Sequence, residues 1–191
     1  VAERVIPPPG RRDWIAILSA ILGAFMAILD IQIINSSLRD IQGALSATIE
    51  EGSWISTSYL VAEIIIIPLA AWLTMVMSAR RFAVVISSCF VLASLLCSLA
   101  WSLESMVVFR VLQGLAGGAL IPFAFMLVLT KLPQADRPKG MAMFAITATF
   151  APSIGPTIGG WLTQNFGWEY IFYINIVPGL VMIAGLLYGL E

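Results

Sequence analysis

The stretch SMVVFRVLQGLAGGALIPFAFMLVLT, residues 105–130, decides the class of fold, because Arg110 is its one charged side chain. A helix needs about 20 such predominantly apolar residues to cross the hydrocarbon core of a bilayer. Five more stretches of this kind flank it. Together they predict approximate membrane helices at 14–38, 52–77, 82–103, 105–130, 140–163 and 168–190. The sequence therefore predicts an all-α transmembrane protein built as a six-helix bundle.

The composition excludes a soluble globular domain. Hydrophobic residues make up 60% of the 191 residues and charged residues 11%, whereas soluble domains average about 45–50% apolar and about 25% charged residues. A cleaved signal peptide would explain at most one of the six stretches. Residues 1–12 are expected to form a polar, proline-rich arm at the cytoplasmic side, and residues 13–191 the helical bundle.

Residue types that commonly hold metals or nucleotides are scarce. The chain has no histidine, and Cys89 and Cys97 lie eight residues apart in one apolar run. A zinc, haem or iron–sulfur site is therefore not expected, and the absence of a phosphate-binding loop argues against ATP as an energy source. We expect no cofactor, no enzymatic activity and no nucleic-acid partner.

The charges outside the membrane stretches are sorted by side. If the chain zigzags, one side carries most of the basic residues: Arg4, Arg11, Arg12, Arg80, Arg81, Lys131, Arg137 and Lys139. The loops of the other side are mainly acidic: Asp40, Glu50, Glu51, Glu104 and Glu169, with Arg39 as the basic exception. Because cytoplasmic loops carry an excess of Lys and Arg, both termini are predicted to be cytoplasmic.

Three charged residues remain inside the predicted membrane helices. At 1.5 Å per residue, Asp30 lies about 12 Å, Glu63 about 15 Å and Arg110 about 9 Å from the outer ends of their helices. Such residues usually face a bundle interior or a water-filled path and mark a function, so we expect proton or substrate coupling at these three positions. The alternative is a buried ion pair that only orders the bundle, which often gives no net stability.

Two helices also carry patterns of small and polar residues. Arg110, Gln113 and Gly117 share one face of their helix, and this polar stripe needs an interior to face. The segment 155–160, GPTIGG, combines a proline that kinks a helix with glycines that allow close helix contacts. A kink without a transport role is the alternative for this segment.

Four motifs resemble the major facilitator superfamily, and most closely its fourteen-helix drug:proton antiporters of the EmrB-like type. They are LDIQIIN at 29–35, RVLQG at 110–114, GPTIGG at 155–160, and AWLTMVMSARR at 71–81. The first has Gln32 where the family has threonine. The last departs most from the family pattern, since Met75 replaces its acidic residue and Ser78 a glycine, although the basic end of this cytoplasmic loop, Arg80 and Arg81, is kept.

This resemblance implies a fold and an activity. The fold is a 3+3 inverted repeat that forms the N-terminal half of a transporter, with the substrate path between the two halves. The activity is proton-coupled export of hydrophobic or amphipathic drug-like compounds across a bacterial inner membrane. The residues implied on the substrate path are Asn35, Gln113, Gly114, Gly155, Pro156, Gly159 and Gly160.

The resemblance also implies partners and leaves alternatives. The expected partners are the missing C-terminal half, the substrate and protons, the lipid bilayer, and a periplasmic adaptor with an outer-membrane channel. The chain is expected to be a fragment, because family members have twelve or fourteen helices. A non-transporting membrane module, a truncated remnant, or an importer of another small molecule remain as alternatives.

Overall fold

The computed structural model describes residues 8–190, and within this range the chain forms seven α-helices. Their bounds are α1 Arg11–Ala44, α2 Ile49–Val76, α3 Ala79–Ser98, α4 Leu103–Lys131, α5 Arg137–Asn165, α6 Tyr170–Tyr173 and α7 Ile176–Gly189. The last two are consecutive pieces of one span, so six helical segments are long and apolar enough to cross a membrane. The predicted all-α transmembrane six-helix bundle is confirmed.

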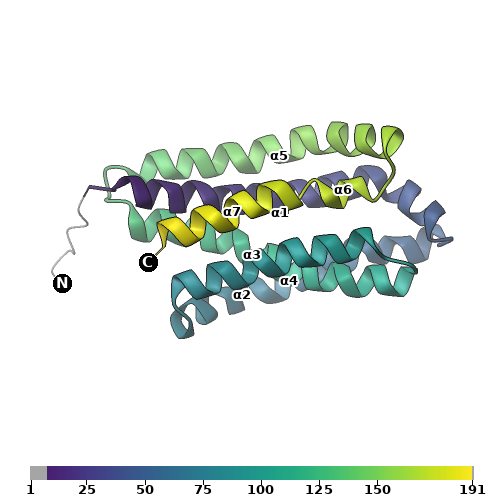
Figure 1. Cartoon of the computed structure of the whole chain (residues 1–191), viewed down its shortest axis with the longest axis horizontal. Coiled ribbons are helices and arrows are strands. Elements are labelled where there is room, and N and C mark those ends of the chain that lie inside the picture. Colours follow the sequence, from purple (N-terminus) through teal and green to yellow (C-terminus); the bar gives the residue numbers. More distant parts are fainter. Residues whose placement is uncertain (1–7, 191) are drawn as a thin grey trace.

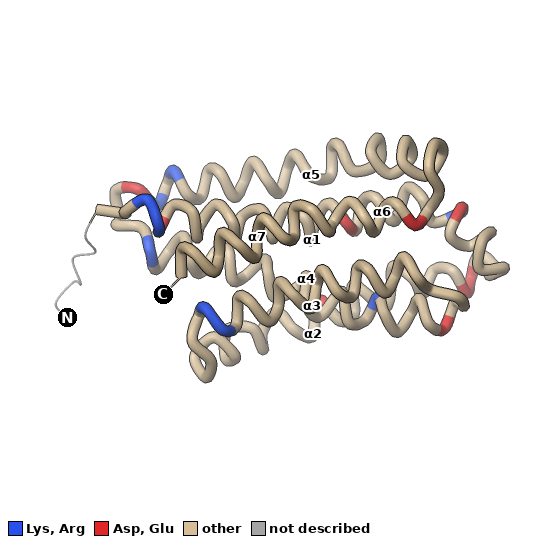
Figure 2. The backbone as a smooth tube through the Cα atoms, in the orientation of Figure 1, with Lys and Arg blue, Asp and Glu red and all other residues tan. Residues whose placement is uncertain are grey.

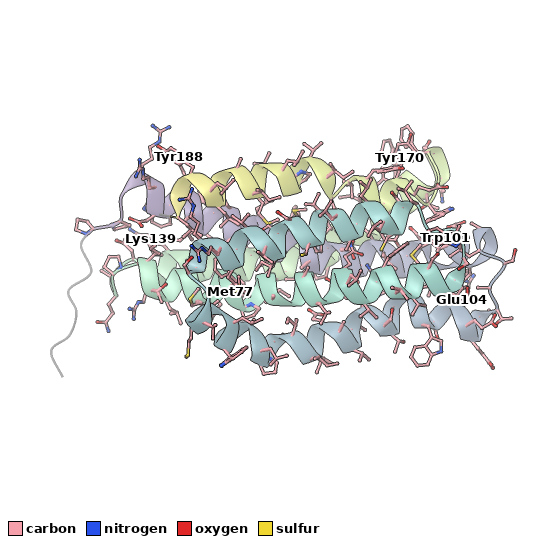
Figure 3. All side chains as sticks on the ribbon, turned by 60° about the horizontal axis from the view of Figure 1, so that its bottom comes forward. Met77, Trp101, Glu104, Lys139, Tyr170 and Tyr188 are labelled. Atoms are coloured by element: carbon pink, nitrogen blue, oxygen red, sulfur yellow. The ribbon has the colours of Figure 1, made fainter. Side chains whose placement is uncertain are left out.

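The spans alternate in direction, and the two ends of the bundle differ in charge. The helix α1 begins and the helix α7 ends at the same end of the molecule (Figure 1). Most Lys and Arg lie at this end and most Asp and Glu at the opposite end, as Figure 2 shows. Figure 3 places Tyr188, Lys139 and Met77 toward the first end, and Tyr170, Trp101 and Glu104 toward the second.

Several helix boundaries differ from the predicted ones because hydropathy marks the apolar part of a helix only. Arg11 and Arg12, assigned to the arm, form the first turn of α1, and Arg39 and Asp40, assigned to an outer loop, lie inside it. Residues 1–7 of the predicted arm lie outside the described residues. In each case the backbone hydrogen bonds of the helix continue into a polar turn beyond the apolar segment.

The start of α2 shows how a cap moves a boundary. The Thr48 hydroxyl accepts a hydrogen bond from the Glu51 amide (3.3 Å), and the Glu51 carboxylate accepts one from the Thr48 amide (2.9 Å). This capping box satisfies two amide groups that the first turn leaves unpaired. Glu50 and Glu51, expected in a loop, therefore lie in the first turn of α2.

The predicted end of the third span and the continuity of the sixth need correction. The helix α3 ends at Ser98 and not at residue 103. The span predicted at 168–190 is interrupted after Tyr173 and resumes at Ile176. Pro178 accounts for this interruption, because it has no N–H for the carbonyl of Ile174 and its ring crowds that carbonyl.

The helix contacts of the first three spans are mirrored by those of the last three. The contact between α1 and α5 corresponds to the contact between α4 and α2. In the same way, the contact between α1 and α7 corresponds to the contact between α4 and α3. This exchange of partners is what a 3+3 repeat predicts. The helices α1 and α4 thus occupy the centre of the bundle, and more of their span is buried than of α2 and α5.

The interior holds two apolar clusters. One cluster lies toward the basic end of the bundle and includes Phe82, Phe90 and Phe123. The other lies toward the acidic end and includes Ile33, Ile55 and Phe172. Between the two clusters, the buried side chains include three polar ones: Ser94 of α3, and Arg110 and Gln113 of α4. The chain therefore buries a polar layer between two apolar ones.

Candidate functional site

The polar layer is centred on an ion pair between α1 and α4. A guanidinium nitrogen of Arg110, Nη1, lies 2.6 Å from Oδ2 of Asp30. Each of the two residues is only 1% exposed. A charge in this position is costly unless it is paired and hydrogen-bonded, so the two charges depend on each other. The similar depth of the two residues made such a pair geometrically possible if their helices touch, and the structure brings them together.

Gln113 lies one helical turn after Arg110 and connects the two charges. Its amide nitrogen donates to Oδ1 of Asp30 (3.0 Å), and its amide oxygen accepts a hydrogen bond from Nη1 of Arg110 (2.6 Å). The same oxygen also accepts a weak hydrogen bond from the Cys97 thiol at 3.5 Å. The spacing of three residues places both side chains on the same face of α4. The polar stripe that the sequence predicted therefore faces the carboxylate of α1.

The helix α2 closes the site around the guanidinium group. Nε of Arg110 donates to the carbonyl oxygen of Ile55 (3.2 Å). The ring of Tyr59 lies against the guanidinium group, with 4.2 Å from the ring centroid to Cζ. A desolvated cation over an aromatic ring gains about 2 kcal/mol or more. Arg110 thus contacts a carboxylate, an amide, a carbonyl and a ring while excluded from water.

Asp30 also receives a hydrogen bond from the interrupted sixth span. The side-chain amide of Asn175 donates to its Oδ1 (2.8 Å) and to the hydroxyl of Ser94 (2.9 Å). Asp30 therefore accepts bonds from Arg110, Gln113 and Asn175, and all three neighbours are donors. The carboxylate is thus enclosed by N–H groups from α4 and from the sixth span.

Protonation of this carboxylate has a structural consequence. A carboxylic acid is a donor, and the three groups bonded to Asp30 present N–H groups that cannot accept from it. A proton on Oδ2 would affect the bond from Arg110, and a proton on Oδ1 would affect those from Gln113 and Asn175.

Two of the predicted polar residues lie outside this network. Glu63 is half-buried on α2, and no hydrogen bond or ion pair of its side chain is found among the described residues. Its Cα and Cγ lie where a β-carbon added at Gly118 would clash. Asn35 is exposed on α1 and accepts a hydrogen bond from the Ser56 hydroxyl of α2 (2.9 Å).

Three of the four predicted glycines of the site lie at helix contacts. A β-carbon at Gly114 would clash with the carbonyl oxygen of Tyr59. One at Gly155 would clash with Gln32 and one at Gly159 with Ser36 and Ile33. These three positions allow close approach of α4 to α2 and of α5 to α1. By contrast, Pro156 is exposed, and a β-carbon at Gly160 would meet nothing within 4 Å.

The remaining predicted positions are the basic pair before the third span. Arg80 and Arg81 are exposed in the first turn of α3, at the basic end of the bundle. Within residues 8–190, no group of three or more His, Cys, Asp and Glu side chains is arranged to hold a metal ion.

Sequence reasoning missed Ser94, Asn175 and Tyr59. Ser94 is one of several serines in an apolar run, and Asn175 lies in a stretch that was treated as uniformly apolar. The helical spacing of the residues in α3 does not distinguish Ser94 from Ser87, which is also buried. For Asn175 the available signal was Pro178 three residues later, which indicates an interrupted helix and thus a place where a polar side chain can be needed.

Comparisons with known proteins agree with this architecture. The profile of the Major Facilitator Superfamily matches residues 20–191. The chain is 44% identical over 181 residues to the colistin resistance protein EmrB of Acinetobacter baumannii, covering 95% of this chain and 35% of that protein. It is 36% identical over 182 residues to the multidrug export protein EmrB of Haemophilus influenzae, covering 95% of this chain and 36% of that protein.

A solved structure gives the same fold at low sequence identity. The proton:xylose symporter XylE bound to 6-bromo-6-deoxy-D-glucose aligns with a TM-score of 0.79 at 17% identity, over 91% of this chain and 44% of that one. The chain spans about a third of the length of the curated relatives and somewhat less than half of this solved transporter. The sequence match and the six membrane helices agree: this chain is an integral membrane segment that belongs to the Major Facilitator Superfamily.

Proposed function

We propose that this chain is half of a proton-coupled antiporter that exports hydrophobic or amphipathic, drug-like compounds. The observation that carries the proposal is the buried ion pair of Asp30 and Arg110 between the two central helices. The sequence similarity of this chain to proteins named for multidrug export and colistin resistance supports the proposed substrate class. Export through the complete protein needs the remainder of the transporter.

The pair supports a simple exchange of proton for substrate. As a carboxylate, Asp30 holds Arg110 across the α1–α4 contact. A proton that binds Asp30 removes the charge that attracts Arg110 and weakens the contact between the two helices. When the proton leaves, Arg110 returns to the carboxylate and the ion pair forms again. Opening of the path to alternate sides would follow this cycle.

Other residues are assigned roles within the same proposal. Glu63 is a second proton-binding candidate, since it lies on α2 close to Gly118 and is only half-buried. The proposed substrate path follows Asn35 of α1 and the neighbouring helices, whose path residues are Gln113, Gly114, Gly155, Pro156, Gly159 and Gly160. Arg80 and Arg81 mark the proposed cytoplasmic loop.

The charge distribution supports an orientation. The basic end of the bundle holds the start of α1 and the end of α7, and an excess of Lys and Arg favours the cytoplasm. Both termini of the chain are therefore proposed to be cytoplasmic, in a bacterial inner membrane. A periplasmic adaptor and an outer-membrane channel are proposed as partners at the acidic end.

Dye efflux with and without an uncoupler tests the proposal. The full-length gene is expressed in a bacterial host that lacks its own drug pumps, and cells are loaded with a cationic dye. We expect efflux that stops when the uncoupler collapses the proton gradient, with the empty vector as control. Efflux that ignores the uncoupler would refute proton coupling, and uptake of the compound would refute export.

A further inference from the structure

The interruption of the sixth span places a polar side chain at the buried carboxylate. The amide of Asn175 bonds to the carbonyl of Phe172 three residues earlier (3.1 Å), and a regular helix resumes when the amide of Gly179 bonds to the carbonyl of Asn175 (3.0 Å). Pro178 prevents a regular helix through this point because it cannot donate to Ile174. Asn175 is thereby presented at the depth of Asp30 and is 2% exposed.

Ser94 fixes the direction of the Asn175 amide. The Ser94 hydroxyl accepts from Asn175 (2.9 Å) and from Gln113 (3.2 Å), and it donates to the Phe172 carbonyl (3.1 Å). A hydroxyl has one proton to donate and two lone pairs to accept, so its capacity is completely used. Each amide that bonds to Asp30 is thus held by the same serine, and that serine is bound to the backbone at the interruption.

We propose that Asn175 is a positioning residue for Asp30, with Ser94 as its anchor, and that it links the interruption of the sixth span to the charge of that carboxylate. This role rests on the proposed proton coupling and goes beyond it, because it adds the sixth span to the coupling machinery. With Asp30 charged, Asn175 donates and the sixth span is tied to α1 and α3. With a proton on Oδ1 of Asp30, the amide turns its oxygen toward the new donor or withdraws, and the bond to Ser94 is disturbed in either case.

The charged and titratable groups that face the Asp30 carboxylate come from helices other than the sixth span. The charged and titratable neighbours are Arg110 of α4, Tyr59 and Glu63 of α2, and Cys97 of α3. Among the described residues, α7 has no charged side chain, and those of α5 lie at its basic end. Asn175 is therefore the contribution of the sixth span to the electrostatics at Asp30.

The pH profile of transport in the full-length protein tests this role. Uncoupler-sensitive dye efflux is measured across pH in reconstituted vesicles for wild type and Asn175→Ala. Loss of one donor makes the carboxylate hold its proton more tightly, so the midpoint of the profile should move up by about one pH unit, which corresponds to a tenfold change in proton affinity. Asn165→Ala is the control, since Asn165 is exposed and bonds to the carbonyl of its own helix.

A second pair of variants keeps the test decisive if Asn175→Ala does not fold. Ser94→Ala leaves the donors of Asp30 in place but removes their anchor, so a smaller upward shift is expected. Ser87→Ala, on the same helix, removes a buried hydroxyl that has no hydrogen-bond partner among residues 8–190 and should leave the profile unchanged. A Ser94→Ala profile that coincides with wild type overturns the role of the anchor, and an unchanged Asn175→Ala profile overturns the proposal. If wild-type efflux ignores the uncoupler, the proposed function itself has failed.

Discussion

The contact of α4 with α2 and the contact of α5 with α1 use the same device with different neighbours. Each has two glycines four residues apart: Gly114 and Gly118 on α4, Gly155 and Gly159 on α5. At all four positions an added β-carbon would lie within 3 Å of the facing helix. The helices approach closely in both contacts because small residues leave the backbones free to meet.

The difference lies in the polar groups beside the glycines. Beside α4 and α2, Arg110 bonds to the Ile55 carbonyl and stacks on a tyrosine ring. Beside α5 and α1, a neutral bond joins the hydroxyls of Thr163 and Ser37 (2.8 Å). The glycine pattern thus indicates where helices pack, and the charged pair beside it is where we propose proton coupling. The role of the segment 155–160 in transport itself stays a prediction.

The largest loss of stability is expected when the ion pair of Asp30 and Arg110 is broken. Arg110→Leu leaves Asp30 as an unpaired buried charge and should lower the stability of the bundle by about 3–5 kcal/mol. The double variant Asp30→Asn with Arg110→Leu removes both charges, so it should recover most of that loss. Thermal unfolding of the detergent-solubilised protein measures both. Equal instability of the single and double variants would show that the two charges do not depend on each other.

A steric change should affect the two glycine contacts alike. Gly118→Leu and Gly159→Leu each place a side chain against the backbone of a facing helix, and each should cost about 1–3 kcal/mol or more. Gly160→Leu is the matched control, because a β-carbon there meets open space. Thermal unfolding checks this as well. If Gly160→Leu were as destabilising as Gly159→Leu, the contact between α5 and α1 would not explain the glycine pattern.

The smallest effect is expected on the neutral side. Thr163→Val keeps the shape of the side chain and removes its hydrogen bond to Ser37. Interhelical hydrogen bonds of this kind in membrane proteins average about 0.6 kcal/mol, so the unfolding temperature should fall slightly and dye efflux should persist. Ser53→Ala, on the exposed start of α2, provides a baseline for an uninvolved hydroxyl. Loss of efflux in Thr163→Val would contradict the proposal that proton coupling lies at the Asp30–Arg110 pair and not at the contact of α5 with α1.

Much of the fold was predictable because membrane insertion imposes a simple pattern. The six apolar stretches and the charge difference between loops are properties of the sequence alone. Helix ends were less predictable, since Arg39 and Glu51 are polar but continue a helix or cap it. The interruption after Tyr173 was missed because the stretch was judged by its hydropathy and not by the position of Pro178.

The candidate site was predictable only in its charged members. Asp30 and Arg110 are conspicuous because a charge inside a membrane helix is costly, and Gln113 follows from the spacing on α4. Ser94 and Asn175 are neutral, so their importance depends on which side chains they meet in three dimensions. Glu63 is the opposite case. Its depth suggested that it lies beside Asp30 and Arg110, but its side chain lies outside their network of hydrogen bonds.

Substrate-induced proton release tests the central claim most directly. The full-length transporter is purified, placed in weakly buffered detergent solution, and mixed with an exported dye while the pH is recorded. The wild-type protein should release protons on binding the dye, and Asp30→Asn, inserted and folded, should release none while still binding it. Proton release by Asp30→Asn equal to that of the wild type would contradict the assignment of the coupled proton to this carboxylate.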